Sequence, residues 1–108
     1  MLKKINRFKA QIFLNKDPKI SRRTDYFGIR GFESVNQYNR FSVIVSKKNI
    51  VSAVLRNKLK RLIFDSLKPY LNSTPHRNYV IIPSPKIKKD FSSELIKLEI
   101  KKILDSIN

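Results

Sequence analysis

Several features that would indicate an independent enzyme or a membrane protein are missing from this sequence. Its 108 residues include no cysteine, which excludes a disulfide framework, a zinc ribbon and thiol chemistry. The one histidine, His76, provides neither a histidine cluster for a metal ion nor a Ser-His-Asp arrangement. No apolar run approaches the roughly 20 residues of a membrane span, and the basic N-terminus lacks the apolar stretch of a signal peptide. These absences predict a cytoplasmic protein with no membrane partner, no small-molecule substrate and no chemistry of its own.

Acidic residues are scarce, and their distribution is informative. The chain has 24 Lys and Arg against 8 Asp and Glu, a formal net charge of +16. Hydrophobic residues make up 41%, enough for one folded domain over residues 1–108. A folded core with this much self-repulsion is typical of a protein that binds a polyanion, nucleic acid by default. No acid lies between Glu33 and Asp65, and the cations of that window are Arg40, Lys47, Lys48, Arg56, Lys58, Lys60 and Arg61. Because a solubility device would mix both signs of charge, the window predicts a binding surface.

Hydrophobic periodicity predicts the order helix, strand, strand, helix, strand, helix. The expected helices cover residues 3–13, 51–68 and the chain from 92 onward, and the expected strands cover 24–32, 40–46 and 78–82. The first strand holds both glycines, which would permit a bulge. Residues 15–23 and 84–91 are expected to be loops. This order indicates an α+β fold with helices packed on one sheet.

The long central helix has an apolar face and a basic face. Pro69 ends the apolar pattern, and either Ser52 or Asn49 is a suitable N-cap. Phe64 is expected to project from the basic arc, where it is suited to stacking on RNA or to contact with a neighbouring side chain. The apolar faces of this helix and of the last one are expected to consist of Val51, Leu55, Leu59, Leu62 and Ile63, and of Ile96, Ile100, Ile103 and Ile107.

The most informative stretch is VSKKNIVSAVLRNKLKRLI, residues 45–63. A strand ends in Ser46-Lys47-Lys48, and a short turn leads into a helix whose outer face carries R-N-x-x-K-R. One helical turn separates Arg56 from Lys60, and another separates Asn57 from Arg61, so long cations can straddle successive phosphates. Asn57 adds a hydrogen-bonding group for ribose or a base edge. An ordinary solvated face would mix Glu with Lys, and no acid occurs here before Asp65.

These residues resemble the bacterial ribonuclease P protein subunit family. Its members have a strand leading into V-S-K-K, a linker of a few residues and a helix that opens A-V-x-R-N-x-x-K-R. The chain matches these with residues 45–48 and 53–61, separated by residues 49–52. Residues 2–9 (LKKINRFK) and 79–83 (YVIIP) are similar to the family's opening segment and last strand. The resemblance thus covers nearly the whole chain and is weakest between residues 10 and 40.

The resemblance implies a fold, a function and a set of partners. The fold would be an α/β sandwich with a mixed sheet of about four strands and a left-handed βαβ crossover, as in the second domain of a ribosomal protein. The chain would be the non-catalytic subunit of an endoribonuclease that removes 5′ leaders from precursor tRNA. The RNA subunit, with Mg²⁺ bound mainly to it, would perform the hydrolysis. The partners would be ribonuclease P RNA and the precursor tRNA leader.

The resemblance also implies two groups of binding residues and no catalytic or metal-ligating residue in the protein. The RNA subunit would be bound by Lys47, Lys48, Arg56, Asn57, Lys58, Lys60 and Arg61. The leader would be bound by Arg7, Phe8, Phe13, Tyr26 and Phe27. Two departures stand out, because the family usually has arginine where this chain has Leu62 and Phe64. The N-terminal helical region is also shorter than is usual for the family.

Three other functions are compatible with part of the pattern. A ribosomal or other structural RNA-binding protein shares the charge and size, and only the two matched motifs argue against it. A stand-alone nuclease would need a general base, and His76 has no acidic residue nearby in sequence. Binding to a membrane surface is electrostatically feasible, but neither of the two clear helices sets aromatic residues against a basic face in the expected way.

Overall fold

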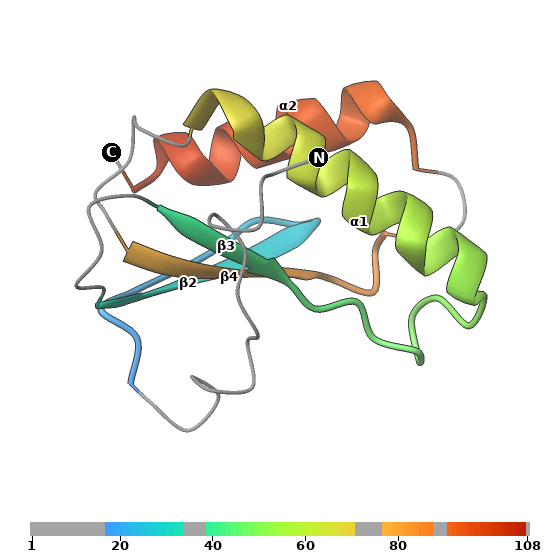
Figure 1. Ribbon diagram of the computed structural model, residues 1–108, viewed down its shortest axis with the longest axis horizontal. Helices are drawn as coiled ribbons and strands as arrows, with labels where there is room; N and C mark the ends of the chain where they lie inside the picture. The colour runs from blue at the N-terminus through green and yellow to red at the C-terminus, as the bar shows by residue number, and fades with distance from the viewer. Residues whose placement is uncertain (1–16, 34–38, 71–76, 88–90, 108) are drawn as a thin grey trace.

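A four-stranded mixed sheet carries two helices on one face (Figure 1). The computed structural model describes residues 17–33, 39–70, 77–87 and 91–107. The strands are β1 (Ile20–Arg23), β2 (Phe27–Glu33), β3 (Arg40–Val43) and β4 (Arg77–Pro83), and the helices are α1 (Ala53–Leu67), a 3₁₀ turn η3 (Lys68–Tyr70) and α2 (Ser93–Asp105). The helix expected at residues 3–13 lies outside the described residues.

The strand order is β1-β2-β4-β3, so the last strand in sequence is inserted between two earlier ones. β2 pairs antiparallel with both β1 and β4, whereas β3 and β4 run parallel. A parallel pair needs a crossover connection, and α1 provides it between β3 and β4. The expected mixed sheet with a βαβ crossover is therefore confirmed. So is the central position of β4, whose apolar run YVII lies between two neighbouring strands.

The edge strand β1 corrects the prediction of a loop over residues 15–23. Its sequence is ISRR, and only Ile20 is partly buried. Such a strand has one pairing neighbour and no alternation of apolar and polar residues, so hydrophobic periodicity gives no signal for it. The glycines of β2 do not form the bulge that the sequence permits, because the register of β2 against β1 and β4 is uninterrupted over all paired residues.

Both helices begin at a serine cap. The Ser52 hydroxyl accepts a hydrogen bond from the Leu55 amide, at an N···O distance of 3.3 Å, and Ser92 does the same for Leu95 at 3.1 Å. Ser52 is thus the cap of α1, and Asn49 lies in the preceding turn. Val51 was expected on the apolar face of this helix, but it precedes the cap and is 83% exposed. Within the described residues, no helix is long and apolar enough to cross a membrane.

The main core fills the space between the sheet and the two helices. Phe27 and Ile29 of β2, Phe41 of β3 and Tyr79 and Ile81 of β4 all belong to it. The helices contribute to this core Leu59, Ile63, Phe64, Leu67, Ile96, Ile100, Ile103 and Leu104. Burying each large apolar side chain contributes about 1.5–3 kcal/mol. Phe64 is only 8% exposed, so its ring is a core side chain and not a platform for RNA, which decides the alternative that the sequence left open.

A second, smaller apolar cluster lies on the opposite face of the sheet. It contains Phe32 and Val80, with Ile44 and Ile82 packed against them. Alternation along β4 places Val80 and Ile82 on this face and Tyr79 and Ile81 on the core face. The sheet therefore has two apolar faces, of which α1 and α2 cover one (Figure 1).

Candidate polyanion-binding surfaces

Residues 46–52, which from here on we call the linker, lead from the end of the β3 segment into α1 and have a defined structure. The Ser46 carbonyl accepts hydrogen bonds from the amides of Asn49 (3.2 Å) and Ile50 (3.1 Å), and its hydroxyl accepts one from the Lys48 amide (3.1 Å). The Ile50 side chain is only 3% exposed and belongs to the main core. The linker is thus a tight turn anchored by an apolar side chain, and Lys47 and Lys48 are exposed on it.

Arg56 connects the first turn of α1 back to this linker. Its Nη1 donates to two consecutive backbone carbonyls, Ile50 O at 2.9 Å and Val51 O at 2.6 Å. The side chain is half-buried, unlike those of its neighbours Asn57 and Lys58, which are exposed. Hydrogen bonds from a charged donor are stronger than those from a neutral one. Arg56 therefore stabilises the linker as well as contributing positive charge to the surface.

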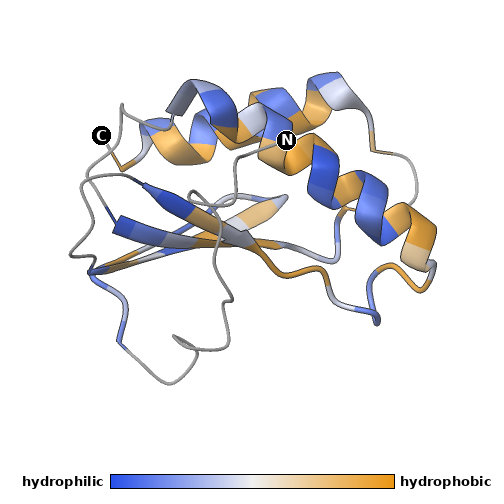
Figure 2. Ribbon diagram, viewed as in Figure 1, coloured by the Kyte–Doolittle hydropathy of each residue, from blue (hydrophilic) through white to orange (hydrophobic). Residues whose placement is uncertain are grey.

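The polar side chains of α1 are spread over a broad arc. Because successive helical residues are rotated by about 100°, Asn57 and Arg61 lie one turn apart on the outer side, where both are exposed. Arg56 and Lys60 lie one turn apart on one flank and are half-buried. Lys58 lies on the other flank, with its Nζ 5.9 Å from the centre of the Phe91 ring. Figure 2 shows hydrophilic and hydrophobic residues alternating along this helix.

The structure brings all seven residues predicted to bind RNA together on α1 and its linker. These seven, which we call the helix surface, are Lys47, Lys48, Arg56, Asn57, Lys58, Lys60 and Arg61. Among the described residues, none of its cations forms an ion pair with a carboxylate. Asp65, one turn beyond Arg61, pairs with Lys68 at 3.6 Å. The positive charge of the helix surface is therefore not neutralised within the described residues.

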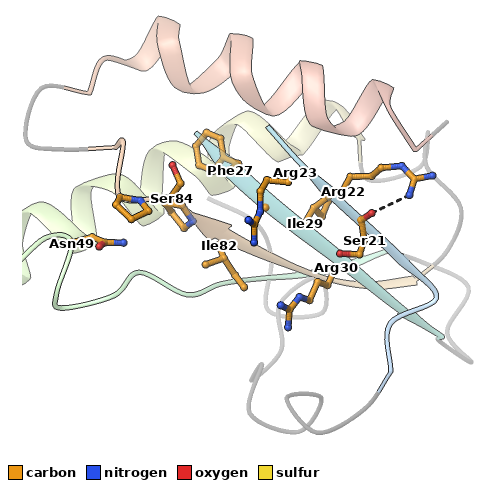
Figure 3. Close-up of a pocket in the computed structure, with 12 residues that line it drawn as sticks. Ser21, Arg22, Arg23, Phe27, Ile29, Arg30, Asn49, Ile82 and Ser84 are labelled. Atoms are coloured by element: carbon orange, nitrogen blue, oxygen red, sulfur yellow. Dashed lines mark hydrogen bonds between the residues drawn. The ribbon is translucent and has the colours of Figure 1, made fainter. Parts of the chain in front are cut away.

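A second basic region, the sheet groove, is a cavity of about 380 Å³ bordered by β1, β2 and β4. Arg23 and Arg30 line it, together with Ile82, Ser84 and, from the linker, Asn49 (Figure 3). Arg23 pairs with Gly28 and Ser21 with Arg30 across the two strands, which places all four on the face away from the helices. Arg22 also lines the cavity, although alternation along β1 directs its side chain to the other face, and its guanidinium donates to the Ser21 carbonyl at 3.0 Å.

Two of the five residues predicted to bind the leader are described, and one of them is contradicted. Phe27 has no exposed surface and lies in the main core, so its ring has no face available to a base. Alternation along β2 explains this, because Phe27 and Ile29 share the face that the helices cover. Arg7, Phe8 and Phe13 lie outside the described residues, and their role stays a prediction.

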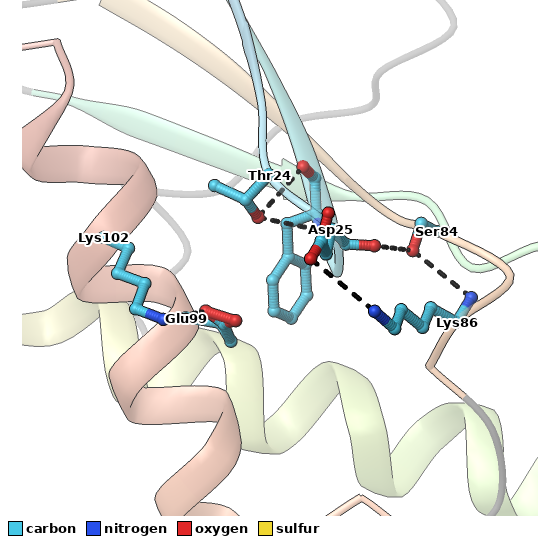
Figure 4. A network of polar contacts seen from close by, with 7 residues as sticks. Thr24, Asp25, Ser84, Lys86, Glu99 and Lys102 are labelled. Carbon is cyan, nitrogen blue, oxygen red and sulfur yellow. Dashed lines mark hydrogen bonds and ion pairs between the residues drawn. The ribbon is translucent and has the colours of Figure 1, made fainter.

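Tyr26, the other described residue, is half-buried in a polar corner that joins the β1–β2 turn to the segment after β4. Lys86 Nζ lies 5.2 Å from the centre of the Tyr26 ring and 3.6 Å from the Asp25 carboxylate. Ser84 donates from its hydroxyl to the Asp25 carbonyl at 2.6 Å (Figure 4). In the same view, buried Glu99 of α2 pairs with Lys102 at 3.4 Å. These contacts fix the surroundings of Tyr26, and its role in leader binding stays a prediction.

The arginines of the sheet groove were missed by the sequence prediction. Arg30 alternates with the core residues of β2, so its outward orientation could have been found from strand period alone. Arg23 lies in the segment that the sequence predicts to be a loop, and only the pairing of β1 with β2 places it beside Arg30.

Fold and surfaces together define a class: a small α+β domain with a basic helix surface that no described carboxylate neutralises and a second basic groove, suited to a polyanion. The sequence pattern of the Ribonuclease P family matches residues 2–108. The chain is 32% identical over 82 residues to the ribonuclease P protein component of Aliivibrio fischeri, covering 76% of this chain and 66% of the relative. The same identity and coverage hold for the Aliivibrio salmonicida protein.

Solved structures agree with this match. The Thermotoga maritima RNase P protein superposes with a TM-score of 0.80 at 22% identity, covering 94% of this chain and 97% of that one. A Staphylococcus aureus RNase P protein mutant gives 0.78 at 25% identity, covering 95% and 88%. The chain belongs to the bacterial ribonuclease P protein component family.

Proposed function

We propose that this chain is the protein subunit of ribonuclease P, a ribonucleoprotein that removes the 5′ leader of precursor tRNA by endonucleolytic cleavage. The observation that carries the proposal is the helix surface: seven matched polar residues, gathered on α1 and its linker, in a member of this family. The chain would bind the catalytic RNA through this surface and act in the cytoplasm, without a membrane partner or a small-molecule substrate.

The helix surface is suited to the backbone of a folded RNA. Exposed Lys47, Lys48 and Arg61 can reach phosphates, and Arg61 can bind one through two parallel hydrogen bonds. Asn57, exposed beside Arg61, can donate and accept at a ribose or base edge. Each neutralised phosphate releases counterions. The logarithm of the binding constant therefore falls with the logarithm of the salt concentration, with a slope of about 0.9 per phosphate contact on a duplex.

The sheet groove is suited to the single-stranded leader. Arg23 and Arg30 supply positive charge for its phosphates, and Ile82 offers an apolar surface to a base. Binding to a single strand commonly combines a basic groove with surfaces for the bases. In this proposal Arg23 and Arg30 join the leader-binding residues expected from the sequence, and buried Phe27 does not contact the leader.

The separate roles of the protein and the RNA subunit follow from their charges. Two RNA molecules, the catalytic subunit and the substrate, repel each other, and the protein would lower that repulsion by presenting cations to both. In this proposal Mg²⁺ belongs to the RNA subunit and supplies metal-assisted attack by water on the phosphodiester. The protein would therefore lower the magnesium concentration at which cleavage proceeds.

Partner preference tests the proposal against a structural RNA-binding protein of another kind. The dissociation constants for bacterial ribonuclease P RNA and for a ribosomal RNA fragment of equal length should be measured at the same salt concentration. We expect tighter binding to ribonuclease P RNA and a loss of that preference in K60A/R61A. Equal affinity for both RNAs would contradict the proposal and favour a general RNA-binding protein.

A further inference from the structure

The linker that carries Lys47 and Lys48 is held at several points. Ser46 closes the turn with three hydrogen bonds, two to its carbonyl and one to its hydroxyl. Ile50 is buried in the core, and Ser52 caps α1. Just before the cap, the backbone carbonyls of Ile50 and Val51 face the side chain of Arg56, which donates a hydrogen bond to each.

The geometry leaves one edge of the Arg56 guanidinium occupied. Nη1 carries two hydrogens, and two carbonyls accept from it at 2.9 and 2.6 Å. A phosphate bound through both terminal nitrogens would have to compete with these carbonyls for Nη1. The neighbouring Lys60, one turn along the same flank, has no such bond to the linker among the described residues.

We propose that Arg56 is a positioning residue: it holds the linker so that Lys47 and Lys48 are presented in a fixed place beside α1. This inference rests on the proposed function, because it assigns the benefit to RNA binding. Ordering two flexible lysines and their backbone at the moment of binding would oppose association, and an ordered linker lowers that entropic penalty. Asn49, in the same turn, lines the sheet groove, so the linker borders both basic surfaces.

The first test uses the free protein. Amide hydrogen exchange should be compared in wild type, R56A and K60A, where K60A removes a cation from the same flank without touching the linker. We expect faster exchange at Asn49 and Ile50 in R56A only, with the amides of the second half of α1 unchanged in both variants. Equal exchange at these two amides in all three proteins would overturn the proposal.

The second test is a double-mutant cycle on affinity for ribonuclease P RNA. In the presence of Lys47 and Lys48, R56A should weaken binding by about tenfold. This is the size expected when the contacts of the two lysines with the RNA are weakened by an amount equal to one charged contact. In the K47A/K48A background it should weaken binding by less than about twofold, whereas K60A should have the same effect in both backgrounds. If R56A acted only by destabilising the fold, or if Arg56 bound a phosphate directly, R56A would weaken RNA binding equally in the two backgrounds.

R56K extends the cycle should R56A fold poorly. Its ammonium can donate to the same carbonyls, so it should restore linker protection and most of the affinity, again only where Lys47 and Lys48 are present. If K47A/K48A binds like wild type while R61A is weakened, positioning is wrong and the proposed function stands. If K47A/K48A, R61A and K60A all bind ribonuclease P RNA as tightly as wild type, the RNA-binding role of the helix surface itself is wrong, whatever the exchange data show.

Discussion

The two basic surfaces of this protein are built in opposite ways. The helix surface is local in sequence, since all seven residues lie between Lys47 and Arg61 on one linker and one helix. The sheet groove combines strands that are distant in sequence, with Arg23 and Arg30 on β1 and β2, and Ile82 on β4. A local surface depends on helix geometry and linker contacts, whereas an assembled one depends on strand pairing. The two should therefore respond differently to mutations of the core, the sheet and the charges.

The largest expected effect separates the core from the groove at neighbouring positions of β2. Phe27→Ala should lower the free energy of unfolding by about 3–5 kcal/mol, because it empties a fully buried site. Arg30→Ala, three residues on and exposed, should change it by less than about 0.5 kcal/mol. Chemical denaturation measures both. A small effect of Phe27→Ala would return its ring to the list of candidate leader contacts.

The next prediction concerns the helix surface. Arg61→Ala should weaken binding to ribonuclease P RNA by about 1–3 kcal/mol and reduce the salt slope by about one. Titrations at several salt concentrations give both numbers, and Asp65→Asn, one turn away, is the control for a change of charge at an exposed position. It should leave affinity unchanged or raise it slightly. Unchanged affinity and slope in Arg61→Ala would remove this residue from the interface.

Strand pairing under the sheet groove is tested at the two glycines of β2. A Cβ at Gly31 would lie 2.9 Å from Ile20 Cγ2 and 3.1 Å from the Tyr79 ring, so Gly31→Ala should lower the free energy of unfolding by about 1–3 kcal/mol. A Cβ at Gly28 meets nothing closer than 3.9 Å, and Gly28→Ala should be tolerated. Thermal unfolding of the two variants decides this, and equal midpoints would contradict the described packing of β1 on β2.

The smallest expected effect concerns the sheet groove and distinguishes precursor tRNA from mature tRNA. Arg23→Ala and Arg30→Ala should each weaken binding of leader-bearing precursor tRNA by about 0.5–1.5 kcal/mol and leave mature tRNA unaffected. Lys101→Ala is the matched control, because Lys101 is an exposed cation of α2 and does not line the groove. Losses of equal size for both tRNAs would show that the groove does not distinguish the leader.

Sequence reasoning predicted the local parts of this molecule and missed the assembled ones. The 3.6-residue period located α1 and α2, with Pro69 marking the end of α1, alternation located β3, and a continuous apolar run located β4. The two motifs around residues 45–61 identify the helix surface from the sequence alone. β1 was missed because an exposed edge strand has no hydrophobic alternation, and the groove was missed with it, since Arg23 reaches Arg30 only through pairing.

The errors in individual residues have the same origin. Phe64 was placed on a basic arc by helical period, yet it is packed in the core. Phe27 was assigned to the leader by analogy with aromatic residues of the family, and strand alternation places it under the helices. In each case the side chain's surroundings come from segments far away in sequence.

Cleavage of a precursor tRNA by ribonuclease P RNA at low magnesium, with and without this protein, tests the central claim most directly. The account predicts cleavage at the mature 5′ end only when RNA and protein are both present, and reduced stimulation by K60A/R61A. Tight RNA binding without any stimulation, or cleavage by the protein alone, would contradict it.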